Sequence, residues 1–321
     1  MSAEWIDYLG WRGVRLSRSR VSLVIAPDIG GRVISLCLDG VEVMFTLAEM
    51  HGRTIDAAAY SDVVRAKKEL GWLHYGGYKT WLAPQARWTE ALPFLDLDSG
   101  SYDVAVEEAP GADTVTLTSP VCRETGAQLS RAVTVDDTGR VTLRQGLINR
   151  SHRPFQWGIW DVTQVRGPGL AILPTSADSG FAGGVKAYES EGQSAQVMAR
   201  YVQPHDGLAT VTCREVEPFK YGTDSRAGWL LGLLEVGADR WLAYLKRFEA
   251  DPGAAYPHGC DVEVYDSGEF PYFELEVHSP LHDLGPGQSC AFPETWTLDW
   301  MPKHRDPRRW LDWIAAAIKG R

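Results

Sequence analysis

The stretch Arg32-Val-Ile-Ser-Leu-Cys-Leu-Asp39-Gly40-Val-Glu-Val-Met-Phe45 carries the pattern that decides the fold. Its central Asp-Gly pair separates an alternating apolar segment from a returning one, which is a strong signal for a β-hairpin turn. Just upstream, Val21–Ala26 has the composition of a strand and runs into the turn-forming residues Pro27-Asp-Ile-Gly-Gly31. This region therefore predicts consecutive short antiparallel strands.

Short β-type runs separated by Gly, Pro, Asp or Asn continue along the chain. Further strands are predicted at Tyr102–Glu107, Thr114–Ser119, Leu129–Val135, Val141–Ile148, Phe155–Val165, Ala209–Val216, Trp229–Val236, Trp241–Phe248, Asp261–Tyr265, Tyr272–Val277 and Gln288–Leu298. Their regular spacing, without amphipathic helices between them, favours large antiparallel sheets packed face to face. The predicted fold class is all-β.

Two segments are predicted to be helical. Residues 48–70, with three consecutive alanines and a charged run, predict a short helical insertion. Residues 305–321 predict a C-terminal helix whose apolar residues share one face, namely Trp310, Trp313, Ile314 and Ala317. Because no repeat, low-complexity tract or linker interrupts the chain, residues 1–321 are predicted to form one domain.

Composition and charge argue against several classes of partner. The 321 residues carry a formal net charge of −10, and the basic residues are scattered except for a short group near Arg308, which argues against nucleic-acid binding. The five cysteines occur singly, which argues against a disulfide framework or a structural zinc site. The sequence shows neither an apolar signal region at its start nor a run of about 18 apolar residues. A cytoplasmic protein without a membrane partner is therefore expected.

Sequence motifs for cofactors are missing as well. The sequence has no GxGxxG opening a helix after a strand, no phosphate-binding GxxxxGK[ST], no GxSxG and no HExxH. We therefore expect no cofactor and no metal ion.

The most unusual feature of the composition is its thirteen tryptophans. The segment from Trp72 to Trp88 is the densest aromatic region, and a sugar site needs such flat apolar faces together with forked polar groups. Its glycine pair and Pro/Gly breaks predict a loop rather than a core strand. The alternative is an aromatic core strand with two exposed charges. The polar and aromatic candidates in this segment are His74, Lys79, Trp81, Gln85, Arg87 and Trp88.

Two later strands offer groups for proton transfer. In Phe155–Val165, Trp160 and Asp161 are expected to reach a cleft. In the last strands, period-2 alternation puts one set of acidic and histidine side chains on a single side. That set is Asp261, Glu263 and Tyr265 on one strand and Glu274, Glu276 and His278 on the next. Carboxylates and a histidine that face a pocket suit general acid–base catalysis, and the alternative is a solvent-exposed face.

Several of these segments resemble galactose-mutarotase-like proteins, the aldose 1-epimerase-like superfamily. Pro27–Leu36 resembles the N-terminal hairpin of the superfamily, and residues 272–296 resemble its closing strands. The segment Gly76-Gly-Tyr-Lys-Thr-Trp-Leu-Ala-Pro-Gln85 is similar to a signature of the DUF4380 branch. The resemblance spans about residues 20 to 300 and implies a β-supersandwich of large antiparallel sheets.

The resemblance also implies roles for particular residues. Glu276, or secondarily Glu274, matches the base that deprotonates the anomeric hydroxyl, and His74, His278 or Asp161 would be the acid. The expected ligand is a mono- or oligosaccharide, and a homodimer is kept as an option. Three functions stay open: an aldose 1-epimerase-like isomerase, a non-catalytic sugar-binding or regulatory protein, and a sugar lyase or hydrolase. The substrate-binding candidates are Arg32, Lys79, Trp81, Gln85, Arg87, Trp88, Trp160, Asp261 and Glu263.

Overall fold

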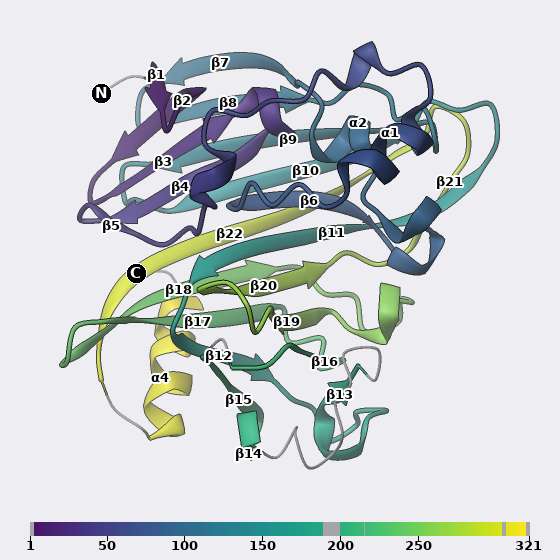
Figure 1. Ribbon diagram of the computed structural model, residues 1–321. Helices are drawn as coiled ribbons and strands as arrows, with labels where there is room; N and C mark the ends of the chain where they lie inside the picture. Colours follow the sequence, from purple (N-terminus) through teal and green to yellow (C-terminus); the bar gives the residue numbers. More distant parts are fainter. Residues whose placement is uncertain (1–2, 189–199, 215, 304–305, 319–321) are drawn as a thin grey trace.

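The computed structural model describes residues 3–188, 200–214, 216–303 and 306–318. Its strands form two large antiparallel sheets that pack against each other (Figure 1). One sheet has 12 strands and the other has 10, counted over the described residues. The predicted all-β fold class is confirmed, whereas the single-domain organisation over residues 1–321 stays a prediction.

The 12-stranded sheet follows the order β1-β2-β3-β4-β6-β11-β20-β19-β16-β13, with β5 paired to β4 and β21 paired to β11. Its strands are β1 Glu4–Tyr8, β2 Trp11–Arg18, β3 Val21–Ala26, β4 Arg32–Leu38, β5 Val41–Glu42, β6 Tyr78–Ala83, β11 Phe155–Arg166, β13 Lys186–Ala187, β16 Phe219–Thr223, β19 Val262–Asp266, β20 Tyr272–His278 and β21 His282–Leu284. The predicted strands Val21–Ala26 and Arg32–Leu38 match β3 and β4, joined to each other through the turn at Gly30 and Gly31.

The 10-stranded sheet follows the order β14-β15-β12-β17-β18-β22-β10-β9-β8-β7. Its strands are β7 Asp103–Ala109, β8 Ala112–Thr118, β9 Ala127–Asp136, β10 Val141–Asn149, β12 Gly169–Pro174, β14 Val202–His205, β15 Leu208–Cys213, β17 Trp229–Val236, β18 Arg240–Phe248 and β22 Ser289–Pro302. Every second residue of β9 is buried, as expected for a strand with one face toward the core. Position 215, inside the predicted strand Ala209–Val216, lies outside the described residues.

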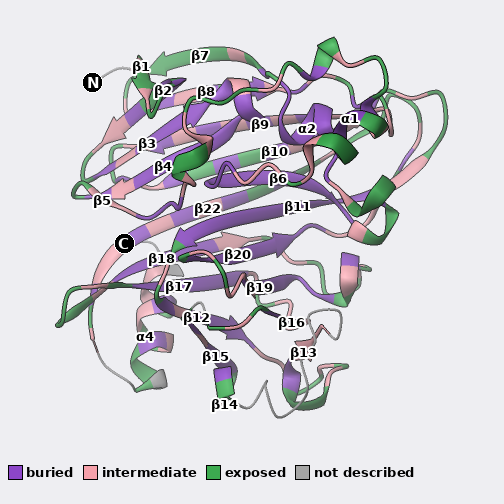
Figure 2. Cartoon of the chain, in the orientation of Figure 1, coloured by how far each residue is buried: buried purple, intermediate pink, exposed green. Residues whose placement is uncertain are grey.

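The main apolar core lies between the sheets. Tyr78 of the 12-stranded sheet and Trp296 of the 10-stranded sheet meet there, with ring centroids 4.9 Å apart. The central strands β6, β11 and β20 are buried along most of their length (Figure 2). A polar side chain on a central strand that is buried on both faces lowers stability unless it has a hydrogen-bond or ion-pair partner.

Helices occupy the periphery of the sandwich. The predicted insertion at 48–70 contains the 3₁₀ turns η2 Ala48–Met50 and η3 Ala57–Ala59 and the helix α1 Val63–Leu70, and α2 Leu95–Asp98 follows later in the chain. The backbone N–H of Arg65 donates to the Asp62 side chain, which caps the start of α1. No helix among the described residues is long and apolar enough to cross a membrane.

The C-terminal helix α4 Pro307–Ile318 covers the outer face of the 10-stranded sheet (Figure 1). Its Trp310 and Ile314 are buried in one cluster with Leu231 of β17 and Leu245 of β18. This confirms the predicted C-terminal helix. Residues 305 and 319–321 of the predicted segment lie outside the described residues.

The prediction of a loop for the segment from Trp72 to Trp88 is wrong at its centre, because Tyr78–Ala83 is the buried strand β6 between β4 and β11. The glycine pair that suggested a loop instead lets the chain enter the sheet. Gly76 and Gly77 have φ angles of 90° and 68°, and a Cβ on Gly76 would lie 2.2 Å from the Phe45 carbonyl oxygen. Only glycine combines this backbone conformation with so close an approach.

Candidate functional site

The register of the central strands places polar and aromatic side chains in rows on one face of the 12-stranded sheet. Lys79 of β6 lies opposite Val162 of β11, and Val162 lies opposite Glu276 of β20. Glu276 in turn lies opposite Glu263 of β19. Side chains alternate along a strand, so residues two positions away share this face. These neighbours are Trp81, Trp160, Gln164, Tyr265, Glu274 and His278.

This face points away from the 10-stranded sheet. The side chains of the intervening positions point the other way, toward that sheet. Thr80 of β6 donates a hydrogen bond to Gln145 of β10, and Asp161 of β11 pairs with Lys246 of β18. The polar rows therefore lie on the side of the sheet that faces away from the main core.

A cavity of about 340 Å³ opens on this face. Its volume falls at the small end of the range of roughly 300–1,000 Å³ that is typical of ligand pockets. The aromatic residues in its wall are Trp72, Trp81, Trp160, Tyr265 and Tyr272. The polar residues in its wall are Arg32, His74, Lys79, Gln85, Asp98, Gln164, Lys220 and Glu274. The wall thus combines flat apolar faces with hydrogen-bonding groups of both charges.

An ion pair between neighbouring strands lies in the cavity wall. Lys79 Nζ is 3.1 Å from Glu274 Oε1, and Gln164 Nε2 donates to the same oxygen at 2.8 Å. Burial opposes ionisation of the Glu274 carboxyl, but Lys79, Lys220 and the Gln164 hydrogen bond outweigh it and lower its pKa. Glu274 is therefore a carboxylate at neutral pH and can accept a proton from a ligand.

The pKa of Lys79 is also lowered, mainly by burial and further by the nearby guanidinium of Arg32, although Glu274 opposes the shift. The Lys79 ammonium lies 4.5 Å from the centroid of the Trp81 ring. His74, at the same cavity, has a pKa lowered by burial and by Lys79, so the neutral imidazole is favoured. The cavity therefore holds a carboxylate next to a lysine that gives up its proton more readily than usual.

A second ion pair closes another part of the wall. Arg32 Nη2 donates to Asp98 Oδ1 at 2.7 Å, and Trp81 Nε1 donates to the same oxygen at 2.7 Å. Both Arg32 and Asp98 are buried. The pair fixes the orientation of the Trp81 ring, which contributes a flat surface to the cavity.

The third cation in the wall, Lys220 of β16, is held by two carboxylates. Its Nζ lies 2.7 Å from Glu276 Oε2 and 2.9 Å from Glu263 Oε2. Burial lowers the pKa of Lys220, but the two carboxylates outweigh burial and raise it above the ordinary value. Lys220 therefore stays an ammonium ion.

Glu276 lies behind this wall rather than in it. Trp160 Nε1 donates to Glu276 Oε2 at 2.7 Å, and both Trp160 and Lys220 stand in the cavity wall. Burial, helped by the charges of Glu263 and Glu274, raises the pKa of Glu276 to about 8 despite Lys220. Its Oε1 is buried and has no hydrogen-bond partner in the described part of the chain. A protonated carboxyl that does not line the cavity is poorly placed to act as a base on a ligand there.

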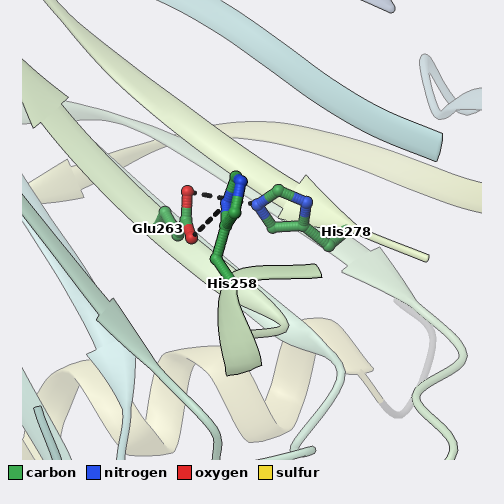
Figure 3. A group of neighbouring side chains, drawn as sticks. All are labelled: His258, Glu263 and His278. Atoms are coloured by element: carbon green, nitrogen blue, oxygen red, sulfur yellow. Dashed lines mark hydrogen bonds and ion pairs between the residues drawn. The ribbon is translucent and has the colours of Figure 1, made fainter. Parts of the chain in front are cut away.

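Two histidines, His258 and His278, flank Glu263 (Figure 3). Both imidazole rings also pack against the Trp160 ring, with centroids 5.3 and 5.4 Å from it. His258 Nδ1 lies 3.1 Å from Glu263 Oε1, and His278 Nε2 lies 3.1 Å from Glu263 Oε2. The three ligand-type atoms lie within 4.8 Å of one another, so these residues have the composition of a His₂Glu metal site.

The surroundings of Glu263 favour a hydrogen-bonded carboxylate over a metal ligand. Tyr188 donates to its Oε1, His258 Nδ1 lies against the same oxygen, and the Lys220 ammonium lies against its Oε2, so three donor groups already surround the carboxylate. His258 Nε2 accepts a hydrogen bond from the backbone N–H of Gln85, which keeps the His258 proton on Nδ1, toward Glu263. We therefore interpret Glu263 as the anion that anchors Lys220 and His258, with His278 close by.

The structure brings most of the predicted binding residues to one place. Of the residues singled out from the sequence, those in the cavity wall are Arg32, His74, Lys79, Trp81, Gln85, Trp160, Tyr265 and Glu274. Glu263, Glu276 and His278 lie directly behind Lys220 and Trp160, within the network just described. Whether any of these residues binds or transforms a ligand stays a prediction.

Four predicted site residues lie elsewhere. Asp161 is on the opposite face of β11, where Lys246 pairs with it between the sheets, so it cannot contact a ligand in the cavity. Arg87 is exposed and donates to Gln156, whereas Trp88 is buried and donates to a backbone carbonyl. Asp261 pairs with Arg226 at 3.0 Å.

Three residues of the cavity wall, Lys220, Asp98 and Gln164, were not predicted from the sequence. Lys220 lies between Phe219 and Tyr221 in β16, a short strand that was not predicted, although the alternation of aromatic and charged residues there was a usable signal. Asp98 lies in the one-turn helix α2, and it contacts Arg32, which is 66 residues away in the sequence. Only the three-dimensional structure shows such a contact.

Comparisons with known proteins agree with this architecture. No protein-family model matches the sequence, and no curated protein matches it either. The structure resembles a galactose mutarotase-like protein from Clostridium acetobutylicum, with a TM-score of 0.57, 10% identity, and coverage of 93% of this chain and 98% of that one. It also resembles an Escherichia coli K12 protein provisionally named an aldose 1-epimerase, with a TM-score of 0.52, 14% identity, and coverage of 89% and 98%.

A third similar structure is a TPR-domain containing protein from Parabacteroides distasonis, with a TM-score of 0.57 and 16% identity. The match covers 90% of this chain but spans only 47% of that larger protein. At these identities the likeness concerns the fold, and membership of the DUF4380 branch stays a prediction. The chain has the galactose mutarotase-like β-sandwich fold with a C-terminal helix.

Proposed function

We propose that the protein binds a monosaccharide in the 340 Å³ cavity and interconverts its anomers, as an aldose 1-epimerase-like isomerase. The observation that carries this proposal is the meeting of tryptophan faces with the Lys79–Glu274 pair in one small cavity. Rings such as those of Trp81 and Trp160 can stack on a sugar face, while the charged groups can bind its hydroxyls. The small volume favours a single sugar unit over a polymer.

In the proposed reaction Glu274 is the general base. Its carboxylate takes the proton of the anomeric hydroxyl, the C1–ring oxygen bond breaks, and the ring oxygen receives a proton. Lys79 supplies that proton, because it adjoins Glu274 and its pKa is lowered toward neutrality. Rotation about the C1–C2 bond and reclosure then give the other anomer. Glu276, the base suggested by sequence resemblance, instead positions Trp160 and Lys220 through its Oε2.

The test is anomer exchange of D-glucose and D-galactose, followed by magnetisation-exchange NMR with and without the protein. Positioned acid–base groups contribute about 10²–10⁴-fold, so Glu274→Gln should lower the exchange rate by a factor in that range. Glu107→Gln, at an exposed position of β7 in the other sheet, is the matched control and should leave the rate unchanged. No acceleration by the unmodified protein across a panel of aldoses would refute the epimerase proposal.

A second candidate is sugar binding without catalysis. It is favoured by the mutual pairing of the charged groups in the wall, since Arg32 and Asp98 neutralise each other as do Lys79 and Glu274. Paired groups hold a ligand by hydrogen bonds without any need to transfer a proton. This candidate predicts that sugars raise the melting temperature of the protein while the rate of anomer exchange stays at its uncatalysed value.

A further inference from the structure

Two lysines face the same cavity but differ in their surroundings. Lys220 contacts two carboxylates, which raise its pKa. Lys79 contacts one carboxylate, stands over the Trp81 ring, and shares the cavity with the Arg32 guanidinium. A lysine that is desolvated or placed near another cation is the kind that reacts as a free amine.

The position of Lys79 also suits attack on a carbonyl group. Its amine is buried within the protein yet stands in the cavity wall, so a small molecule in the cavity can reach it while bulk water is largely displaced. Glu274 Oε1, 3.1 Å from Nζ, can exchange protons with a group bound to that nitrogen. An amine, a proton carrier and a pocket that holds the aldehyde beside them are the requirements for forming a carbon–nitrogen double bond.

We propose that Lys79 forms a reversible iminium bond with the open-chain aldehyde of a small sugar held in this cavity. The free amine adds to the aldehyde carbon, and the carbonyl oxygen leaves as water with one proton from the nitrogen and one from the Glu274 carboxyl. The product is a protonated imine beside the Glu274 carboxylate, so charge and atoms balance.

This inference connects with the proposed function, but its test does not depend on it. In ring opening as proposed, Lys79 gives its proton to the ring oxygen, and Glu274 has just taken one from the anomeric hydroxyl. The free amine and the protonated carboxyl that the iminium step requires are thus present when the aldehyde appears. A preformed aldehyde reaches the same amine without any ring opening.

The experiment incubates the protein with D-glyceraldehyde and sodium cyanoborohydride, which reduces an iminium ion to a stable amine. Peptide mapping by mass spectrometry then compares three lysines in the same sample: Lys79, Lys220 in the same cavity, and exposed Lys68. Burial lowers the pKa of Lys79 and so increases its share of free amine, and the amine stands in the cavity wall, so labelling of Lys79 should exceed that of the other two severalfold. The Lys79→Arg variant should lose this label while exposed Lys68 keeps its low background. Equal or weaker labelling of Lys79 would overturn the inference, whether or not Lys79→Arg folds.

A protection experiment separates this inference from the proposed function. The compound 1,5-anhydroglucitol has a sugar ring without an anomeric hydroxyl, so it can occupy a sugar site but cannot form an aldehyde. Selective labelling of Lys79 that this compound suppresses supports both proposals. Selective labelling that it leaves unchanged supports the iminium proposal and counts against glucose-type sugars as ligands. Anomer exchange without selective labelling would refute the iminium proposal and leave the proposed function standing.

Discussion

At the scale of single residues, the carboxylates of β19 and β20 have different tasks although they share a face. Glu274 lines the cavity and is ionised, whereas Glu276 lies behind Trp160 and has a pKa raised to about 8, chiefly by burial. The Lys220 ammonium, helped by a hydrogen bond from His258, outweighs burial and lowers the pKa of Glu263, so it is ionised. Neighbouring carboxylates with pKa values pushed apart are typical of sites that move protons.

The raised pKa of Glu276 predicts a particular pH dependence of stability. The folded chain keeps this proton up to about pH 8, whereas the ordinary pKa of a glutamate is 4.5. Between these values the unfolded chain has lost a proton that the folded chain retains. The contribution of Glu276 to the free energy of unfolding therefore falls as pH rises through this window, by at most about 1.4 kcal/mol per pH unit.

Thermal unfolding of the unmodified protein and of Glu276→Gln checks this prediction, because glutamine stays neutral at every pH. The melting temperature of the unmodified protein should fall relative to that of Glu276→Gln as pH rises from about 4.5 to about 8. Glu107→Gln serves as the exposed control. A difference between the two proteins that stays constant, or that grows in favour of the unmodified protein, would contradict the raised pKa.

Alternation along single strands allowed the sequence to predict much of the candidate site. Period-2 spacing correctly put Glu274, Glu276 and His278 on one face, and aromatic density pointed to Trp81. Asp161 was misplaced, because the sequence does not reveal which face of a fully buried strand points to the partner sheet. Ion pairs such as Arg32 with Asp98 join residues that are far apart in the sequence, so no local sequence pattern predicts them.

At the scale of elements, β6 determines where the cavity forms. This strand carries Lys79 and Trp81 into the middle of the 12-stranded sheet, and its entry depends on the tight passage of Gly76 beside Phe45. The strands β3 and β4 were predictable, since the residues that form the turns next to them are adjacent in the sequence. Strand β6 was not predictable, because the glycine pair before it is typical of a loop. The function of that pair depends on contact with the distant segment at Phe45.

Gly76→Ala should therefore destabilise the protein more than Gly40→Ala. Both glycines have positive φ angles, 90° and 78°, so both variants carry the strain of a left-handed residue. Only at Gly76 would the new Cβ meet backbone, 2.2 Å from the Phe45 oxygen, whereas nothing lies within 4 Å at Gly40. Forcing that contact should cost about 1–3 kcal/mol beyond the Gly40→Ala effect.

Chemical denaturation of the two alanine variants measures this difference directly. Equal free energies of unfolding for Gly76→Ala and Gly40→Ala would show that the close passage at the start of β6 is not a constraint. The sugar-induced thermal shift of Gly76→Ala is a second readout, since a displaced β6 would also move Lys79 and Trp81.

At the scale of the whole molecule, the 12-stranded sheet carries polar side chains on both of its faces, and the two faces differ in what these side chains contact. Inside the sandwich, Lys246 is paired with Asp161 and lies 3.8 Å from Glu294. On the outer face of the 12-stranded sheet, charged groups gather around an open cavity instead. The fold class followed from strand spacing and turns alone, but the pairing of distant strands that builds the cavity did not. Cytoplasmic localisation and a homodimeric state stay predictions.

The central claim is that this cavity is a sugar-binding site, and a crystal structure of the protein soaked with a reducing aldose tests it most directly. The sugar to use is the one that gives the largest thermal shift in a panel of aldoses. We predict a sugar ring within the cavity, one face toward Trp81 or Trp160 and its hydroxyls within hydrogen-bond distance of Glu274 and Lys79. A sugar bound elsewhere, or a cavity that stays free of sugar at saturating concentration, would contradict the account.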